Sequence, residues 1–172
     1  MPKILNNVFD RIIEVGRKQL SEKEYNNISI RSITKEAHIA TGTFYNYFES
    51  KDHLLSYLIN DNWLEVLSNT EKQLEEVTSF HEGIDLIYNN VNSFTQSHRH
   101  IWRSMTSPLP MAKNHSLIIQ QISNLIHILI DKFNISNLNE FEIIISEFLL
   151  TCVGQEYLSI KDFHKVINRL IK

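Results

Sequence analysis

Apolar residues recur at three- and four-residue spacing along most of this chain, the pattern of amphipathic α-helices. The first stripe predicts a helix over residues 4–20. Two short helical segments, 29–37 and 41–48, follow it, and a long one runs from about 51 to 76. Helices are also expected from 79 onward, over 117–133 and 138–153, and from 159 to the C-terminal region. The pattern therefore predicts an all-α protein of about nine helices.

Polar residues at the expected helix starts support these boundaries. Ser29 and Ser50 stand where an N-cap side chain is needed. Three later starts have a capping-box spacing, in which a polar residue is followed three positions on by an acidic one. These are Ser79 with Glu82, Asn137 with Glu140, and Ser159 with Asp162. Pro108 and Pro110 predict a break between helices.

Composition agrees with a helical, globular chain. Hydrophobic residues make up 42% of the sequence, while Gly occurs only four times and Pro three times. So few turn-forming residues disfavour an all-β fold. The single cysteine, Cys152, has no internal partner for a disulfide. No apolar run approaches the ~20 residues of a membrane span, and the N-terminus does not read as a signal peptide. We therefore expect a cytoplasmic protein without a membrane partner.

The net charge of −3 is unevenly distributed. Up to Ser56 the chain has eight basic and seven acidic residues, whereas the remainder is acidic. The N-terminal part is thus only weakly basic. Contacts to nucleic-acid phosphates there would depend on a local patch, and binding would be sensitive to salt.

The segment from Ser29 to about Phe48 reads as two short helices joined by a tight turn, which suggests a helix-turn-helix. On a helical wheel, Phe44 and Phe48 lie about 40° apart and define the inward face. The outward side and its edges are then formed by Gly42, Thr43, Tyr45, Asn46 and Tyr47.

Tyrosine hydroxyls at both edges suit a helix that lies between two phosphate strands. Gly42 would allow close approach to a DNA backbone. Lys51, at the start of the next helix, could donate to a phosphate. Arg31, in the preceding helix, could reach a guanine edge. Wheel geometry alone leaves open the alternative that both tyrosines pack against neighbouring helices.

At these residues the chain resembles the TetR family of bacterial transcriptional regulators. The match runs from about Leu5 to Leu55, and its most specific part is GTFYNYF at 42–48 followed by SKD at 50–52. The resemblance implies an all-α homodimer with an N-terminal three-helix DNA-binding domain. It also implies a C-terminal domain that binds a small effector and dimerises through its last two helices. By position, the family's DNA contacts fall on Arg31, Thr41, Thr43, Tyr45, Tyr47 and Lys51.

Three positions depart from the family pattern. Glu24 and His38 stand where the family often has glycine, so either turn is expected to differ in detail. Ala40 occupies the cap position of the 41–48 helix, where Ser is common. Because Ala caps poorly, Thr41 is expected either to cap the helix or to read a base.

Residues 1–50 are expected to form the DNA-binding domain. Residues 51–172 are expected to bind the effector and form the dimer interface, with 51–76 as a connecting helix. The 138–153 segment is apolar nearly all round, and the last helix is amphipathic. Both could pair with their copies in a dimer or be buried within one subunit. The predicted interface residues are Phe141, Ile144, Ile145, Phe148, Phe163, Ile167 and Leu170.

Large aromatic and Met side chains suit an apolar effector cavity, although any one of them can be ordinary core. The candidates are Trp63, Tyr88, Phe94, Trp102, Met105 and Met111. The eight histidines show no i, i+4 chelating pair, so no metal site is expected. No catalytic constellation or cofactor motif stands out either, and we expect no enzyme and no cofactor.

These features together predict a ligand-responsive repressor that binds a palindromic double-stranded operator as a homodimer. The alternative is a helical module that binds a small molecule or another protein without binding DNA. Salt titration separates the two, because phosphate contacts weaken as salt rises.

Overall fold

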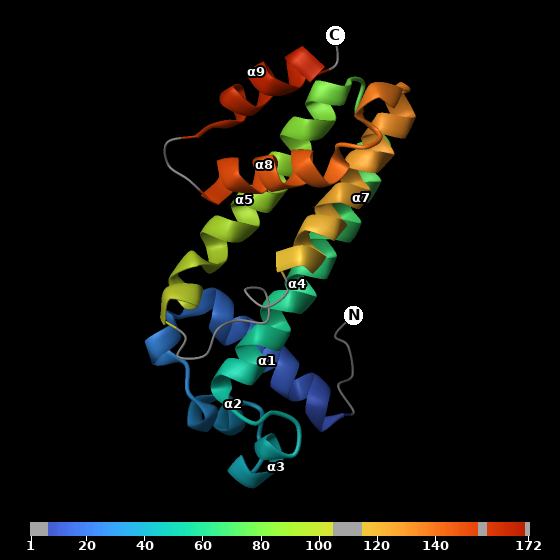
Figure 1. The fold of residues 1–172 in the computed structure, drawn as a ribbon. Helices are drawn as coiled ribbons and strands as arrows, with labels where there is room; N and C mark the ends of the chain where they lie inside the picture. Colours follow the sequence, from blue (N-terminus) through green and yellow to red (C-terminus); the bar gives the residue numbers. More distant parts are fainter. Residues whose placement is uncertain (1–6, 105–114, 155–157, 171–172) are drawn as a thin grey trace. The chain divides into compact units, whose positions relative to one another are not determined.

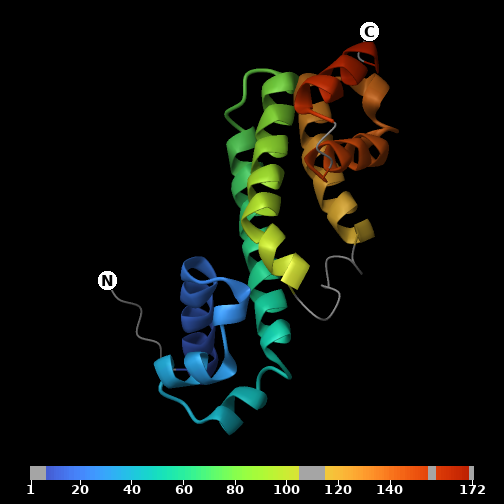
Figure 2. The same ribbon diagram turned by 90° about the vertical axis from the view of Figure 1, so that its left-hand side faces the viewer.

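The computed structural model describes residues 7–104, 115–154 and 158–170. Within these ranges the chain is all-helical, with eight α-helices, two short 3-10 helices and no strand (Figures 1 and 2). In chain order they are α1 (Val8–Glu22), η1 (Tyr25–Asn27), α2 (Ile30–Glu36), α3 (Thr41–Tyr45), α4 (Lys51–Leu74), α5 (Phe80–Ser104), α7 (His115–Phe133), η2 (Ser136–Leu138), α8 (Glu142–Gly154) and α9 (Ile160–Leu170).

The chain divides into two compact units. One comprises residues 1–62 and 98–110, and the other comprises 63–97 and 111–172. Helices α4 and α5 therefore each contribute to both units. Among the described helices, none is long and apolar enough to cross a membrane.

In the first unit, α1, α2 and α3 pack around the first turns of α4. Its interior is formed by apolar side chains from all four helices, including Ile12, Ile33, Phe44, Phe48, Leu54 and Leu55. Helix α1 approaches α4 closely at Gly16, where a Cβ would lie 2.9 Å from a Leu58 methyl carbon. The missing side chain at Gly16 thus sets the distance between these helices.

In the second unit, α8 packs on α7 and α9 packs on α8. The interior is built mainly from aliphatic side chains, including Ile84, Ile87, Ile122, Ile126, Leu129 and Leu149. At Gly83 of α5, a Cβ would lie 2.3 Å from a Leu129 methyl carbon of α7. The two helices can come this close only because residue 83 has no side chain.

Most predicted helix starts are confirmed. Ser29 caps α2 by accepting a hydrogen bond from the Ser32 amide (3.0 Å). Ser159 and Asp162 form the predicted capping box of α9. At α5, Ser79 accepts from the Glu82 amide, while the Glu82 carboxylate accepts from Thr78.

Several predicted boundaries differ by two residues or more from those in the structure, including the end of α4 at Leu74 and the start of α7, which is described from His115. Helix α1 is described from Val8 and extends to Glu22, two residues beyond the predicted end. Helix α3 ends at Tyr45, although the Phe48 amide still donates to the Phe44 carbonyl (3.1 Å). Asn137 does not open α8, which begins at Glu142, because its side chain donates to the carbonyl of Leu170 at the end of α9 (2.6 Å).

Candidate nucleic-acid interface

Helix α3 and the turn that follows it bury their phenylalanines and expose their tyrosines, as the helical wheel predicts. Phe44 is 0% exposed and Phe48 is 2% exposed. Tyr45 and Tyr47, by contrast, are 54% and 41% exposed. The Tyr45 ring contacts Phe44 edge-on, and the Tyr47 ring lies against Phe9 of α1. The tyrosines are therefore partly supported from beneath and still accessible at their surface.

The other candidate contacts on α3 are also accessible. Thr41, Gly42 and Asn46 are exposed, and Thr43 is half-buried. Outside its own helix backbone and chain neighbours, a Cβ added at Gly42 would meet no heavy atom of the described chain within 4 Å. The chain's own packing therefore does not require glycine at residue 42.

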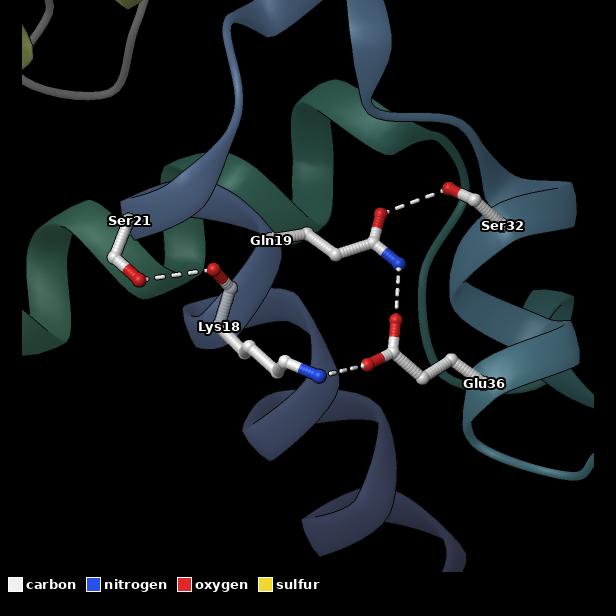
Figure 3. Close-up of polar contacts among 5 residues, drawn as sticks. All are labelled: Lys18, Gln19, Ser21, Ser32 and Glu36. Carbon is white, nitrogen blue, oxygen red and sulfur yellow. Dashed lines mark hydrogen bonds and ion pairs between the residues drawn. The ribbon is translucent and has the colours of Figure 1, made fainter.

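A polar network around the buried Gln19 side chain joins α2 to α1 (Figure 3). Gln19 of α1 is 0% exposed, and its amide hydrogen-bonds at both ends. Its Oε1 accepts from the Ser32 hydroxyl (2.8 Å), and its Nε2 donates to the Glu36 carboxylate (2.8 Å). Lys18 binds the other carboxylate oxygen of Glu36 at 2.7 Å. Because buried polar groups are costly unless paired, this network favours one orientation of α2.

The ion pair in this network shifts both of its ionisable groups. The hydrogen bond from Lys18 lowers the pKa of Glu36, and the bond to Glu36 raises the pKa of Lys18. Sequence reasoning missed Gln19. The available signal was its position, since a polar residue lies on the buried stripe of α1 with Ile12 and Gly16.

The turn between α2 and α3 has left-handed geometry without glycine. His38 has φ of 53°, its amide donates to the Lys35 carbonyl, and the Ile39 amide donates to the Thr34 carbonyl. These two bonds form a Schellman motif, in which glycine normally takes the His38 position. Glu24, in ordinary extended backbone with φ of −67°, has no need of glycine.

Ala40 is the N-cap of α3, and in the described chain no side chain makes a capping hydrogen bond there. Of the two roles open for Thr41, capping is not seen in the described chain. Thr41 is the first residue of the helix and is exposed, so it stays a candidate for reading a base.

Two basic residues predicted to contact DNA lie in different environments. Arg31 is exposed in the first turn of α2. The Lys51 side chain is half-buried: its Nζ donates to the Tyr25 carbonyl (3.0 Å) and lies 3.5 Å from the centre of the Tyr25 ring. Burial lowers the pKa of Lys51.

The first unit also has a cavity of about 400 Å³ beside Tyr25. Its lining comes from η1 and its neighbour Glu24, and from the last turns of α5. The lining residues are Glu24, Tyr25, Asn26, His100 and Ser104. No candidate effector residue from the sequence is among them.

Two of the candidate effector residues come together inside the second unit. Trp63 and Phe94 are both buried, with ring centres 5.0 Å apart. The indole of Trp63 donates to the side-chain oxygen of Gln121 (2.8 Å), a residue that sequence reasoning missed. Tyr88 is half-buried on α5. The Trp102 side chain, Met105 and Met111 lie outside what the structure describes.

The predicted dimer residues divide into a buried and an exposed set. Ile145, Phe163 and Ile167 are almost completely buried within the subunit. Phe163 of α9 stacks on Phe148 of α8, with 5.3 Å between the ring centres. This contact joins the two helices and contributes to the burial of Phe163. Phe148 itself is half-buried.

The exposed apolar set lies on α7, α8 and α9 and at residue 141, just before α8. It includes predicted residues and three that sequence reasoning missed, namely Leu117, Ile143 and Val166. The full set is Leu117, Phe141, Ile143, Ile144, Val166 and Leu170, and we call it the apolar surface of the second unit. Ile143 and Ile144 are each 62% exposed, an unusual position for large aliphatic side chains in a monomer.

Within the described residues, no three His, Cys, Asp or Glu side chains are grouped so as to hold a metal ion. His81 instead hydrogen-bonds Asn168, and His164 hydrogen-bonds Asp85. These two bonds help to join α9 to α5.

Comparison with known proteins gives a consistent result. Residues 12–58 match the family model described as bacterial regulatory proteins, tetR family. An uncharacterized HTH-type transcriptional regulator, YvdT of Bacillus subtilis, is 29% identical over 101 residues, covering 59% of this chain and 52% of that protein. DhaS of Lactococcus lactis, named as the activator of the dhaKLM operon, is 33% identical over 101 residues, covering 51% and 54%. The chain thus spans about half the length of these curated relatives.

A solved structure shows that the likeness in fold extends beyond this domain. It is the Bacillus subtilis regulator FadR in complex with stearoyl-CoA. Its TM-score is 0.56 at 16% identity, and the alignment covers 95% of this chain and 98% of FadR. The relatives described here are regulators of transcription rather than enzymes. Residues 12–58 thus match the tetR family of bacterial regulatory proteins, and the chain shares the fold of FadR.

Proposed function

We propose that this chain is a ligand-responsive repressor that binds a palindromic operator as a homodimer. The observation that carries the proposal is the division of α3 into a buried phenylalanine side and an exposed tyrosine side. A short helix held in this way presents hydroxyl and amide groups to a major groove without losing its anchor. The accessible residues proposed to contact DNA are Arg31, Thr41, Gly42, Thr43, Tyr45, Asn46, Tyr47 and Lys51.

The experiment that tests DNA binding is selection of duplexes from a randomised library, followed by fluorescence anisotropy of a recovered duplex at several salt concentrations. We expect enrichment of a palindrome whose half-sites are about one helical turn apart, and affinity that falls as salt rises. Failure to enrich any duplex would contradict the proposal and favour a protein-interaction module, and salt-independent binding to a recovered duplex would contradict it as well.

Tyr45→Phe tests the role of one hydroxyl. We propose that this hydroxyl donates to a phosphate, so its removal should weaken binding to all duplexes by a similar factor. The measurement is the dissociation constant for the selected duplex and for single-base variants of it. A change in preference at one base pair would instead assign Tyr45 to base reading.

Dimerisation is proposed to use the apolar surface of the second unit. The most exposed members, Ile143 and Ile144, leave apolar side-chain area in contact with water, which is unfavourable unless another subunit covers it. Ile144→Asp should therefore shift the protein toward monomer in sedimentation velocity. Leu64→Asp is the matched control, because Leu64 is 47% exposed on α4, a helix from which the apolar surface as defined takes no residue. Equal effects of both substitutions would contradict the assignment.

The effector is proposed to be a largely apolar small molecule that reaches Trp63 and Phe94. Two buried aromatic rings with one polar group at Gln121 match the usual lining of such sites. Tyr88, Trp102, Met105 and Met111 stay as candidate lining residues. Because FadR, which shares this fold, is solved with stearoyl-CoA, that compound is the first to test. We expect it to lower affinity for the selected duplex. If no compound in a panel of acyl-CoAs, fatty acids and aromatic compounds changes that affinity, the ligand response is contradicted.

A further inference from the structure

The side chain of Tyr25 holds the ammonium group of Lys51 in place. Lys51 is the first residue of α4, and Tyr25 begins the 3-10 helix η1 between α1 and α2. The Lys51 Nζ donates to the Tyr25 carbonyl at 3.0 Å and lies 3.5 Å from the centre of the same residue's ring. One residue thus provides both a hydrogen-bond acceptor and a cation–π surface.

Tyr25 is itself fixed in this position. Its side chain is 8% exposed, and its hydroxyl donates to the Asp52 carboxylate at 2.7 Å. Burial raises the pKa of the Tyr25 phenol to about 12, and the bond to Asp52 acts in the same direction. Since Asp52 follows Lys51 in the first turn of α4, the ring is anchored to the same turn that carries the cation.

The held ammonium keeps donors for another partner. A lysine ammonium has three N–H groups, and the Tyr25 carbonyl accepts one of them. The positive end of the α4 helix dipole lies at the same place in the fold and also favours an anion. A phosphate oxygen there could therefore be bound without first releasing Lys51 from Tyr25.

We propose that Tyr25 is a positioning residue for DNA binding, which fixes the Lys51 ammonium for a backbone phosphate before DNA arrives. This inference rests on the proposed function. A flexible lysine loses side-chain freedom when it binds a phosphate, and a lysine already held on a ring loses less. Tyr25 contributes in this way through Lys51 and not through a contact of its own with DNA.

The test is a double-mutant cycle on the dissociation constant for the selected duplex, measured in the full chain across several salt concentrations. Lys51→Ala should weaken binding and lower the slope of log Kd against log salt by about one. Tyr25→Leu removes the ring and should weaken binding about fivefold, a magnitude typical of a cation–π contact. Tyr25→Phe, which keeps the ring, should change the affinity less than twofold.

The cycle separates positioning from a general effect on the fold. In the Lys51→Ala background, Tyr25→Leu should cause no further loss of affinity. An equal loss in both backgrounds would show a purely structural role for Tyr25, and tighter binding by Tyr25→Leu would show that Tyr25 withholds Lys51 from DNA. Either result overturns the proposal. If Lys51→Ala leaves affinity and slope unchanged while the wild type still binds the duplex, the positioning role fails and the proposed function stands.

A second measurement needs no substitution in the core. After reductive ¹³C-methylation of the lysines, the NMR signal of Lys51 should be shifted upfield by the ring beneath it, and Lys51→Arg assigns that signal. We expect the upfield shift to persist when the selected duplex is added. Movement to the ordinary lysine position on binding would show that Lys51 leaves the ring, and would overturn the proposal.

Discussion

Replacing His38 with glycine should stabilise the protein. His38 holds φ of 53° in the turn between α2 and α3, a conformation that costs a residue with a Cβ about 1–2 kcal/mol. Glycine avoids this cost but brings roughly 0.5–1 kcal/mol of additional chain entropy in the unfolded state. The expected net gain is about 0.5–1 kcal/mol in the free energy of unfolding, or roughly 1–4 °C in Tm for a chain of this size.

Urea unfolding followed by circular dichroism measures this gain, and His38→Ala is the matched control. Alanine keeps the steric cost, so it should be about 1 kcal/mol less stable than the glycine variant. Asn134→Gly, at φ of 55°, should gain less, because asparagine tolerates left-handed backbone better than histidine. A glycine variant no more stable than the alanine variant would refute the claim that the turn is strained.

Three further changes test the packing and capping described above. Ala40→Ser should raise the free energy of unfolding by about 1 kcal/mol, because it supplies the missing cap of α3; an unchanged melting curve would contradict this. Gly83→Ala should cost about 1–3 kcal/mol, since its Cβ would overlap Leu129, and the same substitution should cost clearly less in a Leu129→Ala background if the overlap is the cause. Hydrogen bonds from Lys165 and Ser159 lower the pKa of Asp162 to about 2. Its stabilising effect is therefore complete above the ordinary Asp pKa of about 3.9 and is lost as pH falls toward 2. The difference in Tm between wild type and Asp162→Asn should accordingly narrow as pH falls from about 4 to about 2, and a constant difference would contradict this assignment.

Local signals in the sequence were sufficient for much of the DNA-binding domain. Ser29 caps α2 because the bond it makes spans only three residues, and such bonds depend little on the rest of the fold. The inward position of Phe44 and Phe48 follows from helical geometry in the same way. Asn137 shows the limit of this reasoning, because its side chain binds a carbonyl 33 residues away instead of capping the nearby helix.

The dimer surface could be predicted only in part. Helix α8 is apolar nearly all round, so its sequence does not indicate which side faces the subunit's own core. That choice depends on tertiary packing, such as the contact of Phe148 with Phe163. As a result Ile145 was assigned to a surface although it is buried, and Ile143 was missed although it is exposed.

The central claim is that the exposed side of α3 enters a DNA groove, and Gly42→Ala tests it most directly. A Cβ at residue 42 meets open space in the described chain, and alanine favours a helix, so the variant should fold at least as well as wild type. Gly154→Ala is the matched control, since Gly154 is exposed with equally open surroundings on α8. Anisotropy titration of the selected duplex should show clearly weaker binding by Gly42→Ala and unchanged binding by Gly154→Ala. Wild-type affinity in a folded, dimeric Gly42→Ala protein would contradict the claim.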